Sequence, residues 1–153
     1  LRSSKEYFQY WYKKDGRSSY IQSAKRYQLL EGYVINPEFV EFLKNHTNSQ
    51  VFIFSNCGDI EDIVKLKFPI LRDIRFFSAG KIGCFKPNQR SFEIIKSEMG
   101  VQAEQIIYCG DNIMNDYICP RLANIEAKLY TKEDLSLKLP YISTVSNLAF
   151  MGL

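Results

Sequence analysis

Two apolar stretches of this chain end in residues that could bind an anion or a metal ion. The stretch 51–54 is followed by Ser-Asn-Cys-Gly-Asp, which offers a hydroxyl, an amide and a flexible backbone just before a predicted helix. The dipole and the N–H groups of a helix N-terminus favour an anion. We therefore predict that the segment Ser55, Asn56 and Cys57 binds an anion, of which a phosphate group is one example. Alternatively, Ser55 or Asn56 caps the helix that follows.

The second stretch, 105–109, is followed by Gly-Asp-Asn-Ile-Met-Asn-Asp. Asp111 and Asp116 place two carboxylates on a tight turn into a helix. Hard cations such as Mg²⁺ prefer such oxygen ligands and keep room for water and a phosphate. We predict that Asp111 and Asp116 bind Mg²⁺ as a cofactor, although a capping residue with a first-turn acid would show the same pattern.

A lysine lies between these two segments in the chain, at Lys86, directly before Pro87. A proline restricts the preceding residue to an extended backbone, so the lysine side chain can be aimed. Beside clustered acids and a phosphate, an ammonium group would neutralise developing charge. The alternative is that Lys86 does not lie near such groups and is an ordinary surface residue.

The elements that must position these residues alternate along the chain. We predict strands at 51–54, 75–78, 105–109 and 127–130, and helices at 37–45, 59–67, 89–99 and 115–123. This alternation predicts an α/β fold with a mainly parallel, Rossmann-like sheet flanked by helices. The first and third strands lack polar alternation, as expected when both faces of a strand are covered. Ligands of such sheets bind outside the carboxyl ends of the strands, so the polar segments should share one crevice.

Two further regions complete the predicted organisation. Residues 1–31 show two helical patterns rich in tyrosine and phenylalanine, which favours packing in a core or interface over a ligand wall. The tail after residue 130 predicts one more short helix.

Composition argues against several classes of function. The net charge of +3 is small and scattered, which argues against nucleic-acid binding. No apolar run approaches the ~20 residues of a membrane span, and no signal peptide is visible. Four cysteines without a C-x-x-C pair predict reduced thiols in the cytoplasm. The single histidine, His46, lies in a polar segment, which argues against a zinc site and a Ser-His-Asp or Cys-His nucleophile.

The order of these motifs resembles the haloacid dehalogenase-like (HAD) hydrolase superfamily over residues 30–135. Ser55 matches the family's second motif, Lys86 its third, and Asp111 with Asp116 its fourth. The likeness is to the phosphatase and dehalogenase branch, in which a helical cap follows the first motif. Residues 1–29 would then be a partial cap, and residues 30–153 the HAD-like core.

The resemblance implies a phosphatase that acts on a small phosphorylated metabolite. In that family an Asp-x-Asp motif ends a strand: its first aspartate attacks phosphorus and forms an aspartyl-phosphate, and its second acts as acid and then as base. Mg²⁺ shields the charge. By this likeness, Ser55 would hold a phosphate oxygen, Lys86 would steady nucleophile and phosphate, and Asp111 would bind the metal. Asp116 would bind the metal too or orient Lys86.

The nucleophile motif itself is missing, because no Asp-x-Asp occurs in the sequence. The nearest segment, Lys13-Lys14-Asp15, has a lysine in the nucleophile position. We expect an N-terminal segment or a second chain to supply the motif and complete the sheet, and this chain alone to be inactive. The competing hypothesis is a catalytically inactive HAD-like domain that binds phosphate, another ligand or a protein. A receiver-like or flavodoxin-like module and dehalogenase chemistry also stay open.

Overall fold

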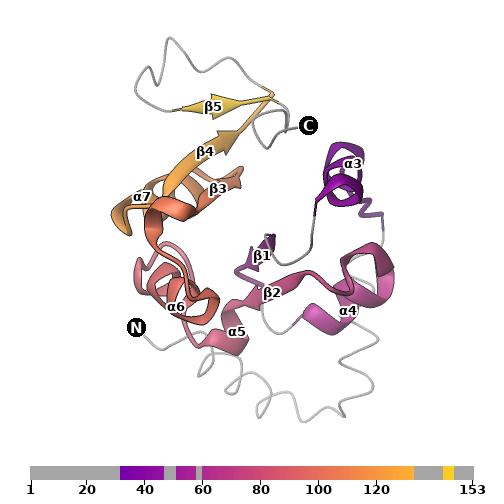
Figure 1. Cartoon of the computed structure of the whole chain (residues 1–153), viewed down its shortest axis with the longest axis horizontal. Helices are drawn as coiled ribbons and strands as arrows, with labels where there is room; N and C mark the ends of the chain where they lie inside the picture. Colours follow the sequence, from indigo (N-terminus) through magenta and orange to yellow (C-terminus); the bar gives the residue numbers. More distant parts are fainter. Residues whose placement is uncertain (1–31, 47–50, 58–59, 133–142, 147–153) are drawn as a thin grey trace. The chain divides into compact units, whose positions relative to one another are not determined.

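The computed structural model describes residues 32–46, 51–57, 60–132 and 143–146 (Figure 1). The partial cap predicted for residues 1–29 and the segment around Asp15 lie outside the described residues. The chain divides into two compact units, residues 1–84 and 85–153, and each is described by itself.

The first unit contains a two-stranded parallel sheet with helices against it. Its elements are α3 (Pro37–Asn45), β1 (Phe52–Ser55), α4 (Glu61–Lys67), the 3₁₀-helix η2 (Pro69–Leu71), β2 (Arg75–Ser78) and α5 (Ala79–Ile82). Strands β1 and β2 run parallel with Ser55 opposite Ser78, and α4 and α5 contact β2 (Figure 1).

Local signals in the sequence account for the ends of these helices. Asn36 caps α3, because its side chain accepts a hydrogen bond of 2.9 Å from the backbone N–H of Glu38, and Pro37 occupies the first turn. Glu61 at the start of α4 accepts hydrogen bonds from Lys65, at 2.8 Å, and from Lys81 of α5, at 2.9 Å. This carboxylate therefore ties α4 to α5.

The second unit contains a three-stranded parallel sheet in the order β3-β4-β5. Its elements are α6 (Arg90–Met99), the 3₁₀-helix η3 (Ala103–Gln105), β3 (Ile107–Gly110), the π-helix η4 (Ile113–Ile118), α7 (Cys119–Leu122), β4 (Glu126–Tyr130) and β5 (Thr144–Val145). Helix η4 packs on β3 and β4, and α7 packs on β4. The core under η4 contains Tyr117, Ala127 and Leu129.

The predicted α/β fold with parallel strands is confirmed. All four predicted strands are present, and their ends differ from the predicted ones by no more than two residues. The helix predicted from residue 115 begins earlier, at Ile113, as a π-helix. The short elements η2, α5, η3 and β5 were not predicted. In the tail the structure describes residues 131–132 and 143–146, which include the strand β5, and the predicted tail helix is not among these residues.

Burial differs from the prediction in the third strand. Ile107, the first residue of β3, is 52% exposed, so β3 is not covered on both faces at its start. In the described part of the chain, β1 has β2 as its strand neighbour and β3 has β4, in two separate sheets. Another strand beside them, supplied by a further segment, stays a prediction.

Two other predictions can be compared with the structure. The four cysteines are free thiols, of which Cys84 and Cys119 are buried, Cys109 is half-buried and Cys57 is exposed. Within the residues that the structure describes, no helix has the length and apolar character needed to cross a membrane.

Candidate functional site

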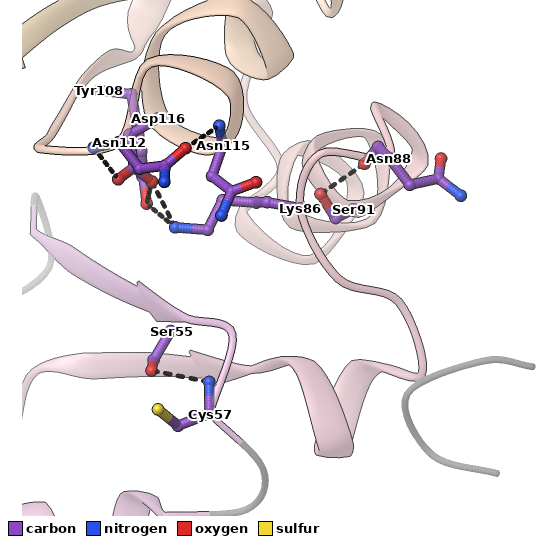
Figure 2. A network of polar contacts seen from close by, with 9 residues as sticks. All are labelled: Ser55, Cys57, Lys86, Asn88, Ser91, Tyr108, Asn112, Asn115 and Asp116. Atoms are coloured by element: carbon purple, nitrogen blue, oxygen red, sulfur yellow. Dashed lines mark hydrogen bonds and ion pairs between the residues drawn. The ribbon is translucent and has the colours of Figure 1, made fainter. Parts of the chain in front are cut away.

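A buried ion pair joins Lys86 to Asp116 in the second unit, and Figure 2 shows it with its neighbours. Both residues are 6% exposed, and Lys86 Nζ lies 2.5 Å from Asp116 Oδ1. Removing two charges from water is costly, so a buried pair of this kind needs close contact and further hydrogen bonds. The structure therefore brings together two of the predicted site residues, from positions 30 residues apart.

Tyr108 of β3 supplies one of those further hydrogen bonds. Lys86 Nζ donates to the Tyr108 hydroxyl oxygen at 2.8 Å, and that hydroxyl lies 3.4 Å from Asp116 Oδ1 (Figure 2). The tyrosine ring packs edge-on against Phe92 of α6, with ring centroids 4.8 Å apart. Tyr108 was not predicted as a site residue. Strand periodicity offered a signal, because Tyr108 and Gly110 are two residues apart and face the same side.

The turn after β3 holds the Asp116 carboxylate in place. The backbone N–H of Asn112 donates to Asp116 Oδ2 at 3.1 Å, and the Asn112 side chain caps η4 by accepting from the N–H of Asn115 at 2.9 Å. Residue 110 must be glycine because the Asp116 side chain lies close to its backbone. A Cβ atom at this position would lie 2.4 Å from Asp116 Cγ. The sequence Gly-Asp-Asn therefore serves both to turn the chain and to make room for Asp116.

The surroundings of Asp116 shift the pKa of two neighbouring groups. Burial and the Asp116 charge raise the pKa of Tyr108 well above its usual value, so the phenol stays neutral and can donate its proton. Burial, Asp116 and Asp111 raise the pKa of the Cys109 thiol to about 11. Cys109 is therefore a protonated thiol at neutral pH, which makes it a poor nucleophile and a poor metal ligand.

Asp111 follows β3 directly and is exposed to solvent. An exposed carboxylate suits Mg²⁺, which keeps several waters and is usually bound through one or two carboxylates plus phosphate oxygens. Asp116 differs, because both of its oxygens already accept from protein donors. Among the described residues no group of three or more histidine, cysteine, aspartate or glutamate side chains could hold a metal ion. This donor set fits a hard cation only if water, phosphate or another segment adds ligands.

Ser55 lies in the first unit, at the carboxyl end of β1. Its hydroxyl oxygen accepts a hydrogen bond of 3.2 Å from the backbone N–H of Cys57 (Figure 2). Helix α4 begins after Ile60, which makes no side-chain capping hydrogen bond. The alternative that Ser55 or Asn56 caps this helix stays a prediction. Asn56 is half-buried and Cys57 is exposed. Residues 58 and 59, the last two of the Ser-Asn-Cys-Gly-Asp segment, lie outside the described residues.

Comparison with known proteins supports the fold. No family model matches the chain, and a search of curated proteins found no significant match. Among solved structures, the chain is similar to a 2-haloacid dehalogenase from Pseudomonas syringae pv. tomato DC3000, with a TM-score of 0.60 and 20% identity. The match covers 78% of this chain and 52% of the dehalogenase, so it spans about half of that protein. At this level of identity the likeness concerns the fold alone, and the chain has a Rossmann-like α/β fold similar to that of the dehalogenase.

Proposed function

We propose that this chain is the core of a HAD-like hydrolase, a Mg²⁺-dependent phosphatase that acts on a small phosphorylated metabolite. The observation that carries the proposal is the buried Lys86–Asp116 pair, which lies with the exposed Asp111 at the carboxyl end of β3. Ligands of parallel α/β sheets bind at such strand ends. Buried charged groups are costly to keep for stability alone, so their presence there favours a functional site.

The described contacts suggest separate roles for the two aspartates. Asp111 would hold Mg²⁺, which supplies charge neutralisation at the phosphate when bound. Asp116 would orient Lys86 rather than bind the metal, because its oxygens accept from Lys86, Tyr108 and Asn112. Lys86 would steady the nucleophile and the phosphate.

The phosphate would also contact the segment after β1. Ser55 would hold a phosphate oxygen, with Asn56 and Cys57 contributing to the same loop. The likeness to the HAD family supports this assignment.

The nucleophile would come from a segment outside this sequence, or from a second chain, because the sequence contains no Asp-x-Asp. Its aspartate would attack phosphorus, the P–O bond to the alcohol would break, and the alcohol would leave with a proton from the second aspartate. Water would then hydrolyse the aspartyl-phosphate to inorganic phosphate and the original carboxylate. The four thiols suit a reducing compartment, so we also propose a cytoplasmic location.

The test is hydrolysis of p-nitrophenyl phosphate by the full-length protein with Mg²⁺. We expect EDTA to abolish turnover and Asp111→Asn to lower kcat/KM by about 100-fold or more, as for loss of a charge-stabilising group. Asp73→Asn is the matched control, since Asp73 is also an exposed aspartate but lies before β2. Equal activity of the two variants would disprove the role of Asp111.

Two alternative functions are each favoured by a specific observation. The solved structure that resembles this chain is a 2-haloacid dehalogenase, so release of halide from a 2-haloacid without Mg²⁺ would favour that chemistry. The missing Asp-x-Asp favours an inactive HAD-like domain that binds phosphate, another ligand or a protein. Mg²⁺ or phosphate binding by the full-length protein without turnover would support that alternative.

A further inference from the structure

The Tyr108 hydroxyl lies between the two charged groups of the buried pair. It is 2.8 Å from Lys86 Nζ and 3.4 Å from Asp116 Oδ1, and the residue is 7% exposed. The direction of these hydrogen bonds follows from the groups themselves. An ammonium group can only donate and an ionised carboxylate can only accept, so the phenol accepts from Lys86 and donates to Asp116.

This arrangement constrains Lys86 more tightly than the ion pair alone. A lysine side chain has a flexible stem of four carbons. Contact with one oxygen fixes the distance of Nζ from that oxygen but not the direction in which the ammonium group points. Contacts with Asp116 at 2.5 Å and with Tyr108 at 2.8 Å fix both. The edge-on contact between Tyr108 and Phe92 holds the ring itself, because Phe92 is fully buried in α6.

Core packing alone does not account for a tyrosine at this position. A phenylalanine would provide the same ring for Phe92, and a buried hydroxyl adds a cost unless it is hydrogen-bonded. The hydroxyl is directed instead at the one buried ammonium among the described residues.

We propose that Tyr108 is a positioning residue that fixes the direction of the Lys86 ammonium group. The proposal rests on the proposed function for its consequence in catalysis, but the positioning itself can be measured without turnover. Tyr108 would act through Lys86 and would not contact the phosphate.

The experiment is trace acetylation of the full-length protein with acetic anhydride, with the rate at each lysine read by mass spectrometry. Tyr108→Phe should raise the Lys86 rate about tenfold, since one hydrogen bond to a charged group is lost. Lys96 is the internal reference, because it is partly buried in the same unit and paired with Glu93 at 2.8 Å. Its rate should not change.

The matched control is Tyr117→Phe, which removes another buried hydroxyl from the same unit. The Tyr117 hydroxyl accepts from the backbone N–H of Ser143 at 3.1 Å. This variant should leave the Lys86 rate as in the wild type. An unchanged Lys86 rate in Tyr108→Phe would overturn the proposal. So would an equal rise at Lys86 and Lys96, because it would show general loosening of the unit.

Activity measurements then separate this proposal from the proposed function. With p-nitrophenyl phosphate, Tyr108→Phe should lower kcat about tenfold through misplacement of Lys86, and Tyr117→Phe should not. If the wild-type protein hydrolyses nothing, the proposed function fails, and the labelling ratio still decides whether Tyr108 positions Lys86.

Discussion

Two serines, Ser78 and Ser91, are both fully buried but differ in their hydrogen bonds. The Ser91 hydroxyl donates to the backbone carbonyl of Asn88 at 2.7 Å. The Ser78 hydroxyl has no hydrogen-bond partner among the described residues, although Ser78 stands at the start of α5, where a serine side chain often caps. The cost of an unsatisfied buried hydroxyl therefore applies to Ser78 and not to Ser91.

We expect Ser78→Ala to raise the free energy of unfolding by about 1 kcal/mol, because it removes a buried polar group that makes no hydrogen bond to the described residues. Ser91→Ala should lower it by about 1 kcal/mol, because a hydrogen bond is lost. Urea unfolding of both variants and the wild type measures the difference. A loss of stability in Ser78→Ala as large as that in Ser91→Ala would show that the Ser78 hydroxyl is bonded in solution.

The junction between β3 and η4 is the element on which the candidate site depends. Tyr108 and Gly110 belong to the strand, and Asp111 belongs to the turn that follows it. Asp116 lies in the π-helix, which places its carboxylate back against the strand. The backbone N–H of Asp116 donates to the Asn112 carbonyl at 2.7 Å, which closes this return. A change that widens the junction should therefore displace Asp116 from Lys86.

Gly110→Ala is the change that tests this junction. Its Cβ would overlap Asp116, so we expect a loss of about 1–3 kcal/mol in unfolding free energy and faster acetylation of Lys86. Gly100 is the control, because it has a φ of +65° at the end of α6 and nothing within 4 Å of a built Cβ.

The two glycines should respond differently to a larger side chain. Gly100→Asn should be better tolerated than Gly100→Ala, since asparagine adopts the left-handed conformation more readily. Gly110→Asn should be worse than Gly110→Ala, because the constraint there is space. If Gly110→Ala keeps wild-type stability, Asp116 does not pack against Gly110 as described.

At the scale of the whole molecule, the proposed reaction needs a nucleophile that the described residues do not supply. The sequence has no Asp-x-Asp, and Cys109 is held as a thiol by its raised pKa. His46 is engaged at the end of α3, where its ring stacks on Phe42 and Nδ1 lies 2.8 Å from the Phe42 carbonyl oxygen.

We therefore expect the 153-residue chain alone to show no hydrolysis of p-nitrophenyl phosphate with Mg²⁺. A longer protein that joins this chain to a strand ending in Asp-x-Asp should hydrolyse it. The comparison is a phosphate-release assay on both proteins at equal concentration, with buffer alone as the blank. Turnover by the 153-residue chain that disappears in Asp111→Asn would place the nucleophile within these residues and contradict the expectation.

Much of the fold could be predicted because its signals are local. Asn36 and Pro37 predicted the start of α3, and the apolar residues of β2 predicted that strand at its observed bounds, 75–78. The short helix α5 and the two-residue strand β5 were not predicted, because elements of that length show no periodic pattern in the sequence. The helix after β3 was predicted two residues late, since its π-helical hydrogen bonds depend on how it packs on β3 and β4.

The sequence by itself determined the order of strands and helices and the residue types at the strand ends, because both follow from side-chain periodicity and turn chemistry within a few residues. Only the tertiary structure decided what those residues do to one another. Lys86 meets Tyr108 across 22 residues and Asp116 across 30, and no local pattern encodes such contacts. The physical reason is the burial of one ammonium group, which needs hydrogen-bond acceptors wherever the fold places them. The pairing of Asp116 with Lys86 and the contact from Tyr108 supply those acceptors. The need for glycine at 110 follows, because Asp116 packs against that position.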